Sequence, residues 1–198
     1  MFLNGALLGL DLNPAGLQID TGNAFDHASQ GLTSSGENAL FQVSYSPSPN
    51  GCSGNGDSGI GQLVLHNLES GTCEEIVSGS AGYPYPASGT HVSATAYKQP
   101  GWAALSSIGH GQTHFLTSSN PAPALLSEIY LVNTDSDDRT VCRLAHHRSF
   151  GRDAVNTANY NAYFGEPHVA MIPSGTRIIF ASDWYDSGSV DAYVIDLR

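Results

Sequence analysis

The chain carries one short pattern three times, and this repeat constrains the fold more than any other feature of the sequence. Each copy opens with a histidine that is followed by small or β-branched residues, as in Asp26-His27-Ala28-Ser29, Thr90-His91-Val92-Ser93 and Pro167-His168-Val169-Ala170. The opening histidines are 64 and 77 residues apart. The repeat predicts that one unit of structure recurs along the chain.

Each opening histidine precedes a similar series of short apolar runs. One run, a polar loop and another run follow in turn: 39–45 and 62–67 in the first copy, 102–108 and 128–133 in the second, and 177–182 and 191–197 in the third. In the first two copies a turn leads to a further run, at 72–77 and at 140–145. Short runs of near-alternating polarity with turn residues between them predict antiparallel β-strands.

Four antiparallel strands in each repeat are typical of a β-propeller blade. The composition agrees, because glycine (22) and proline (10) are plentiful and charged residues, on which helices rely, make up only 13%. We therefore expect an all-β chain with a single, partial β-propeller domain over 1–198. Its blades are predicted at 26–78, 90–147 and 166–198, with a partial blade at 1–22.

The number of blades bears on how the ring closes. A propeller usually has about four to eight blades, and an open one exposes sheet edges. Three arrangements fit the repeat: one part of a ring of about seven blades, a ring closed by copies with about 3.5 blades each, and a small ring of about four blades. In the last arrangement, the strands expected at 6–20 complete the final blade. The sequence leaves all three arrangements open.

The most specific pattern lies in Glu166–Leu197, EPHVAMIPSGTRIIFASDWYDSGSVDAYVIDL. It resembles the blade pattern xxSPDGxxIxFxSDW…VDxYVxxL of bacterial TolB-like and polysaccharide-lyase-like propellers, with Ile172-Pro173-Ser174-Gly175 in place of the usual Ser-Pro-Asp-Gly. The run Arg143–His147, a long loop and then Glu166-Pro167-His168 are similar to the last two blades of that group. The resemblance extends over about 26–198 and implies the fold. It does not imply one activity, since propellers host many functions.

The three in-phase histidines are the first candidates for chemistry. The first strand of each propeller blade lines the central channel, so His27, His91 and His168 are expected to converge there. Converging imidazoles can bind a divalent metal ion or supply a general base. The alternative is a structural histidine that recurs because each blade needs the same hydrogen bond. The resemblance to oligogalacturonate-lyase-like propellers implies a histidine-rich metal site at the channel mouth.

His146 and His147 end the last strand of the second repeat. Adjacent residues of a strand point to opposite faces, so only one of the two can join His91 and His168. We expect His146 to do so, the alternative being two surface imidazoles beside a turn. The predicted metal ligands are therefore His91, His146 and His168, for one divalent ion that the sequence does not identify as Mn, Ca or Zn.

The loop 148–165 mixes arginines with asparagines and aromatic residues. Aromatic rings stack on sugars and arginine forms paired hydrogen bonds with carboxylates, so the loop favours an acidic carbohydrate as ligand. Ulvan-lyase-like propellers, to which the resemblance extends, imply a catalytic tyrosine or histidine with a helping arginine. Tyr160 and Arg152 are the predicted catalytic residues. Arg148, Tyr163 and Trp184 are predicted to bind substrate, although a packing loop and a core Trp184 are the alternatives.

The net charge of −11 limits the partners of the chain. A nucleic acid or an anionic membrane surface is not expected, because seven lysines and arginines cannot build a large basic face. Residues 1–12 are apolar but lack a basic start and contain Asn4 and Asp11, so neither a signal peptide nor a membrane span is predicted. A periplasmic or extracellular location is expected only if a signal lies upstream.

The three cysteines form no metal-binding CxxC pair. Cys52 and Cys73 flank one predicted strand, which leaves a disulfide and two free thiols both open. Cys142 lies within an apolar run and is expected to be a buried free thiol.

Two functions are compatible with these residues. The first is a propeller scaffold or binding module, without complete activity in this chain alone and associated with further copies or part of a larger propeller. The second is a metal-assisted lyase that abstracts a proton beside the carboxylate of a uronate-containing saccharide, with Tyr160 or an imidazole as base and Arg152 positioning the sugar. No Gly-x-Ser-x-Gly or His-Glu-x-x-His motif supports a hydrolase.

Overall fold

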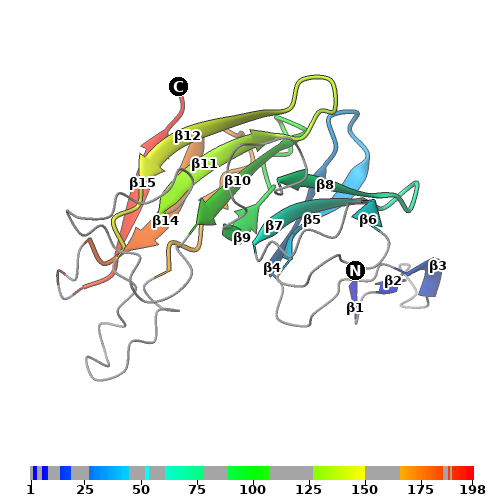
Figure 1. Ribbon diagram of the computed structural model, residues 1–198, viewed down its shortest axis with the longest axis horizontal. Helices are drawn as coiled ribbons and strands as arrows, with labels where there is room; N and C mark the ends of the chain where they lie inside the picture. The colour runs from blue at the N-terminus through cyan, green and yellow to red at the C-terminus, as the bar shows by residue number, and fades with distance from the viewer. Residues whose placement is uncertain are drawn as a thin grey trace.

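The computed structural model describes most of the predicted blades and is all-β. It describes residues 27–44, 61–77, 89–107, 127–149, 166–184, 187 and 189–198, together with the backbone of short strands at 2–3, 6–8, 14–18 and 52–53. These residues form strands, turns and irregular segments, with no helix among them (Figure 1). Within this part of the chain there is accordingly no helix that could cross a membrane.

The strands form separate sheets in chain order, and we name three of them as blades. The first blade contains β4 (His27–Leu32), β5 (Asn38–Ser44), β7 (Gln62–Asn67) and β8 (Cys73–Val77), with the short β6 (Cys52–Ser53) parallel to β8. The second contains β9 (Gly89–Ser93), β10 (Trp102–Ser107), β11 (Glu128–Asn133) and β12 (Thr140–His146), and the third β13 (Ala170–Met171), β14 (Arg177–Ser182) and β15 (Asp191–Asp196). A further sheet contains β1 (Phe2–Leu3), β2 (Ala6–Leu8) and β3 (Pro14–Gln18).

Within each blade, strands that follow one another in the sequence pair antiparallel. This is the strand order of a propeller blade, so the predicted fold class is confirmed. The turn residues act as the sequence indicates: Gly175 adopts a φ of 73° and donates its backbone N–H to Ile172 O at 2.8 Å. A left-handed φ of this kind is open to glycine without steric cost.

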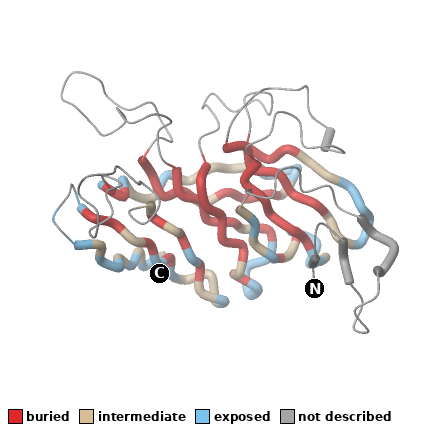
Figure 2. The backbone as a smooth tube through the Cα atoms, turned by 90° about the horizontal axis from the view of Figure 1, so that it is seen from below, coloured by how far each residue is buried: buried red, intermediate tan, exposed pale blue. Residues whose placement is uncertain are grey.

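Two apolar layers hold the blades together. The first lies between the first and second blades, where Phe41 and Val43 of β5 pack with Ala103 and Leu105 of β10. The second lies between the second and third blades, where Ala104 of β10 is in one cluster with residues of β14. Alternate residues of β10 face opposite sides and Ala103–Ser107 are all buried, so this strand is covered on both faces, among the buried segments that Figure 2 colours red.

The first strands of the three blades lie side by side, and serine hydroxyls tie them together. Ser29, two residues after His27, accepts the backbone N–H of Ala94 at 2.9 Å. Ser93, two residues after His91, accepts the backbone N–H of Met171 at 2.9 Å. The serine in phase with each of these histidines therefore makes the same bond to the next blade, which gives the repeat a structural reason.

Two cysteines differ in state. Cys73 is disulfide-bonded. Cys142 is a free thiol, as expected, but it is only partly buried. The backbone of Cys52 pairs with that of Cys73 between β6 and β8.

Candidate metal centre

Three histidines from three blades meet at the inner strands. The ring of His91 stacks on that of His27, with centroids 4.1 Å apart and planes at 15°. The centroid of the His91 ring also lies 4.0 Å from that of the His168 ring, with the two planes at 48°. The repeat phase brings these residues together because equivalent positions of neighbouring blades lie side by side.

A carboxylate that the sequence reasoning missed joins two of these histidines. Glu166 Oε2 lies 3.4 Å from His91 Nδ1. One potential ligand atom from each of His91, Glu166 and His168 lies within 4.8 Å of the other two. The available signal is the third repeat itself, which alone has a carboxylate two residues before its histidine; the first two have Phe25 and Gly89 there.

Burial sets the protonation states of this group. Burial, and then the neighbouring His168 and His27, lower the pKa of His91 from 6.5 to about 3. Burial raises the pKa of Glu166 from 4.5 to about 7. His91 is therefore neutral at physiological pH, which is the form in which imidazole binds metal ions.

The donor set fits a divalent metal ion. Two imidazoles and one carboxylate are a ligand set of Zn²⁺ and of other divalent transition ions, and three protein ligands leave coordination positions for a small molecule. Two ligand atoms at about 2.1 Å from a tetrahedral ion lie about 3.4 Å apart, which is close to the separation of His91 Nδ1 and Glu166 Oε2.

His168 has an unusual backbone conformation. Its φ is 42°, in the left-handed region that non-glycine residues rarely occupy. Ser127 (57°), Arg148 (55°) and Trp184 (41°) are the other non-glycine residues of the described chain with positive φ. Backbone strain of this kind persists where the surrounding structure imposes it, and it concentrates at binding and active sites.

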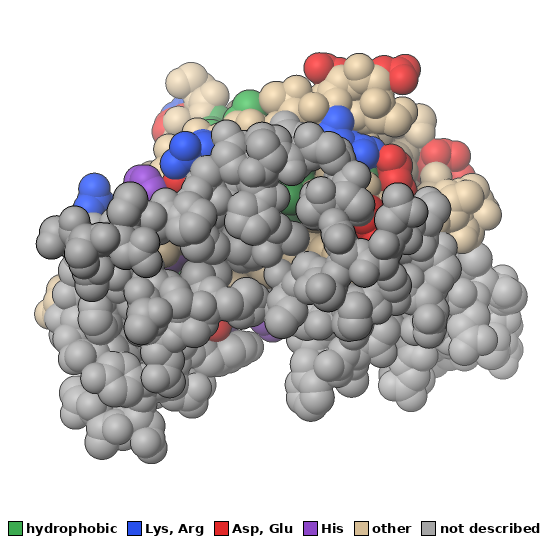
Figure 3. All heavy atoms as spheres, viewed as in Figure 1, with side chains coloured by type: hydrophobic (Ala, Val, Ile, Leu, Met, Phe, Trp, Pro, Cys, Tyr) green, Lys and Arg blue, Asp and Glu red, His purple; other side chains and the backbone are tan. Residues whose placement is uncertain are grey.

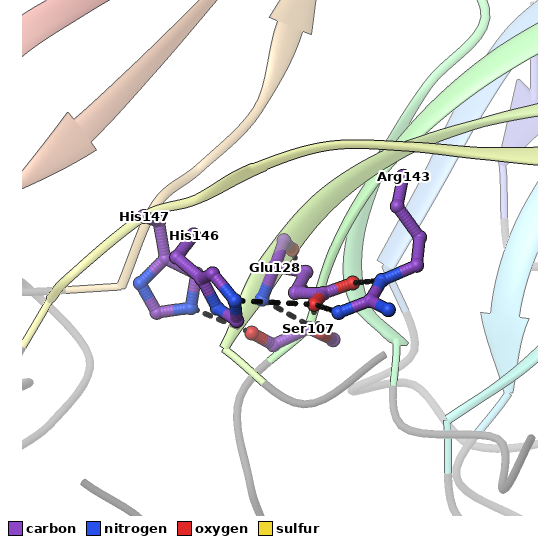
Figure 4. Close-up of polar contacts among 5 residues, drawn as sticks. All are labelled: Ser107, Glu128, Arg143, His146 and His147. Atoms are coloured by element: carbon purple, nitrogen blue, oxygen red, sulfur yellow. Dashed lines mark hydrogen bonds and ion pairs between the residues drawn. The ribbon is translucent and has the colours of Figure 1, made fainter. Parts of the chain in front are cut away.

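His146, the third predicted ligand, lies in a different group. Its Nε2 is 3.5 Å from Glu128 Oε1, and His146 is not among the close ligand atoms around His91. His147 is fully buried, and its Nε2 donates to Ser107 O at 2.7 Å (Figure 4). The two adjacent histidines thus do point to different surroundings, one half-exposed and one internal.

Arg148 and Trp184 contact each other between the second and third blades. Arg148 Cζ lies 5.6 Å from the centroid of the Trp184 ring, and this ring stacks on Tyr193 with centroids 5.0 Å apart. Trp184 is 43% exposed, so it is not a core residue. The remaining predicted residues, Arg152, Tyr160 and Tyr163, lie outside the described residues.

Comparison with known proteins identifies no family for the chain. No protein-family model matches the chain, and no curated protein matches it. Among solved structures, it is similar to an oligogalacturonate lyase from Vibrio parahaemolyticus, with a TM-score of 0.45 and 13% identity. The match covers 89% of this chain and 37% of the lyase, so the chain spans little more than a third of that protein. The blades themselves, rather than this likeness, establish the fold.

Proposed function

We propose that the chain is a metal-binding β-propeller module for acidic carbohydrate. One observation carries the proposal: potential ligand atoms of His91, Glu166 and His168, from two neighbouring blades, lie within 4.8 Å of one another. When bound, the metal ion would supply a positive charge to which the carboxylate of a sugar acid can bind. His91 needs no deprotonation to serve as a ligand, because burial holds it neutral.

A carbohydrate ligand is supported by Arg148 and Trp184. An aromatic ring that is partly exposed beside a guanidinium offers a stacking surface and a carboxylate-binding group together. A backbone hydrogen bond links β14, which precedes Trp184, to the metal group. Ala181 N–H of this strand donates to Pro167 O at 2.6 Å, and Pro167 directly precedes His168.

Metal content tests the proposal directly. Purified protein dialysed against Zn²⁺ or Mn²⁺ and then against buffer should retain about one ion per chain, as elemental analysis would measure. His91→Ala and His168→Ala should lose this ion, whereas His146→Ala is the matched control and should retain it. Wild-type protein that retains no ion, or a His146→Ala variant that loses it as fully as the others, would refute the site.

A second candidate function is a metal-assisted lyase, and His27 favours it. His27 Nδ1 lies 2.5 Å from the carbonyl oxygen of Thr90, which can only accept, so Nδ1–H donates to it. An imidazole fixed in this way has the orientation that a general base needs, and the ring stacks on His91 of the metal group. In a lyase, His27 Nε2 would accept the proton beside the uronate carboxylate.

The two functions differ in one measurement. A lyase acting on oligogalacturonate forms an unsaturated product, which ultraviolet absorbance detects. His27→Ala should abolish this product while the metal content stays unchanged, since His27 is not one of the three ligands. Binding of oligogalacturonate without product would leave the binding module as the function and exclude the lyase.

A further inference from the structure

Strand β12 contains a β-bulge near the point where the second blade ends. Tyr130 pairs with Arg143 and Ile129 with Ala145, so Leu144 is an extra residue without an opposite partner. Beyond the bulge, Glu128 pairs with His146. In a regular strand, Arg143 and His146 would point to opposite faces, but the extra residue places both on the face of Glu128.

Glu128 contacts both of these side chains. Arg143 Nε donates to Glu128 Oε2 at 2.7 Å, and Arg143 Nη2 donates to Glu128 Oε1. His146 Nε2 lies 3.5 Å from the same Oε1. Figure 4 shows the carboxylate between the guanidinium on one side and the imidazole on the other.

The base of this arrangement is rigid. The backbone N–H of Glu128 donates to Ser107 Oγ at 3.1 Å, and Ser107 O in turn accepts Nε2–H of the buried His147 at 2.7 Å. The Glu128 side chain is 3% exposed, whereas those of Arg143 and His146 are 48% and 43% exposed. The buried carboxylate of Glu128, on a backbone fixed by hydrogen bonds, thus holds the side chains of Arg143 and His146 at the surface.

Burying a carboxylate is costly, and stability alone does not explain this one. The desolvation of a buried carboxylate offsets much of what its ion pair contributes to stability. A residue held for orientation, in contrast, must keep its charge to fix the arginine through two hydrogen bonds. β-Bulges that re-aim side chains are also enriched beside active and binding sites. These features indicate a role for Arg143 and His146 in binding.

The charge distribution favours an anion at this end of the blade. Figure 3 shows Asp and Glu atoms at the β11–β12 turn, and Lys or Arg and His atoms towards the other end of β12, where some carboxylate atoms lie beside them. That turn contains the exposed Asp137 and Asp138. In a chain with a net charge of −11, an anion meets local attraction only where cationic groups gather.

We infer that Arg143 and His146, oriented by Glu128, form an oxyanion-binding site for a carboxylate or phosphate group. The site is separate from the group of His91, Glu166 and His168, and binding there requires no metal ion. Arg143 contributes its charge and N–H donors, and His146 contributes an imidazole on the same face. Glu128 is a positioning residue, because it acts through Arg143.

Calorimetric titration of the metal-free protein, in the presence of a chelator, tests this site. The probes are a galacturonate oligosaccharide and inorganic phosphate, which distinguish the carboxylate from the phosphate. Arg143→Lys keeps the charge but loses the paired hydrogen bonds, and should weaken binding of the preferred probe about tenfold or more. Arg177→Lys is the matched control. Arg177 Nε lies 3.6 Å from Asp196 Oδ2, so this arginine is paired with a carboxylate other than Glu128.

The outcomes are distinguishable from failure of the metal proposal. Binding that persists in chelator, falls in Arg143→Lys and is unchanged in Arg177→Lys supports the site, whether or not His91 binds metal. Glu128→Gln should also weaken binding of the probe. Near-ultraviolet circular dichroism shows whether this variant folds, and if it does not fold, the result for Arg143→Lys alone tests the site. Equal loss in both lysine variants, no effect of Arg143→Lys, no binding of either probe, or binding that disappears with chelator would overturn the inference.

Discussion

The imidazoles of His91 and His168 lie 4.0 Å apart between ring centroids, although they belong to different blades. Nothing in either blade alone creates this contact. It arises because Ser93 in β9 accepts the N–H of Met171 in β13, which fixes the register of the two inner strands. The same bond therefore sets both the packing of the blades and the spacing of the candidate ligands.

Metal ions should stabilise the fold through Glu166. A divalent ion at about a hundredfold excess over its dissociation constant raises the free energy of unfolding by ~2.7 kcal/mol. Thermal unfolding with and without Zn²⁺ or Mn²⁺ measures this gain. Glu166→Gln keeps the shape of the side chain but removes the anionic ligand, so it should abolish most of the gain in unfolding free energy. Glu69→Gln, in an exposed turn, is the control and should keep the full gain. An equal gain in Glu166→Gln would exclude that carboxylate as a ligand.

Acid should destabilise the fold through His147. Its Nε2 donates to Ser107 O and its Nδ1 accepts the N–H of Ser149 at 3.0 Å, so the neutral ring satisfies both bonds. Burial lowers its pKa from 6.5 to about 4. Because the folded-state pKa is the lower one, this stability is fully present above pH 6.5 and is lost as the pH falls towards 4.

The loss assigned to His147 should be roughly 3 kcal/mol across that window, of which about 2 kcal/mol falls between pH 7 and pH 5. Urea unfolding of the wild type and of His147→Asn at pH 7 and at pH 5 measures it as a smaller pH dependence in the variant. His146→Asn provides the control, since that side chain is half-exposed. His91, whose pKa is also lowered, adds to the slope of every protein and cancels in the comparison. Parallel pH profiles for wild type and His147→Asn would contradict the prediction.

Gly31 should tolerate no side chain. A Cβ at this position would lie 2.5 Å from Ala94 O and 2.9 Å from Phe41 Cε2, where β4 approaches β9. Gly31→Ala is expected to cost about 2–3 kcal/mol of unfolding free energy through overpacking. Gly36→Ala, in a turn with φ of 89° and open space around it, should cost about 1 kcal/mol from backbone strain alone. Equal losses in the two variants would mean that the blades separate easily at Gly31.

The disulfide of Cys73 should contribute to stability by restricting the unfolded chain. Cys73→Ser is expected to lower the unfolding free energy by about 3 kcal/mol, and a reductant should lower that of the wild type by a similar amount. Cys142→Ser removes the free thiol and should leave the effect of the reductant unchanged. If reductant changes the unfolding free energy of neither the wild type nor Cys142→Ser, the disulfide adds nothing to the stability of the fold.

The sequence by itself determined the local structure and the repeat. The run 62–67 became β7 (Gln62–Asn67) and the run 177–182 became β14 (Arg177–Ser182), because alternating apolar residues between turns encode strands locally. The phase of the repeat also indicated that His27, His91 and His168 would meet, since equivalent positions of adjacent blades lie side by side. The turn at Gly175 followed from residue chemistry alone.

The tertiary structure alone decided which groups complete the two candidate sites. Glu166 precedes β13 and reaches His91 only because the blades pack across the inner strands; its place in the third repeat marks it in the sequence but does not give this contact. The sequence predicts His146 as the metal ligand of the adjacent histidine pair, but its Nε2 lies beside Glu128 instead. The bulge at Leu144 shifts the alternation by one residue and turns His146 with Arg143 towards Glu128. Such a shift depends on pairing with β11 and on packing between blades, which residue-by-residue patterns do not contain.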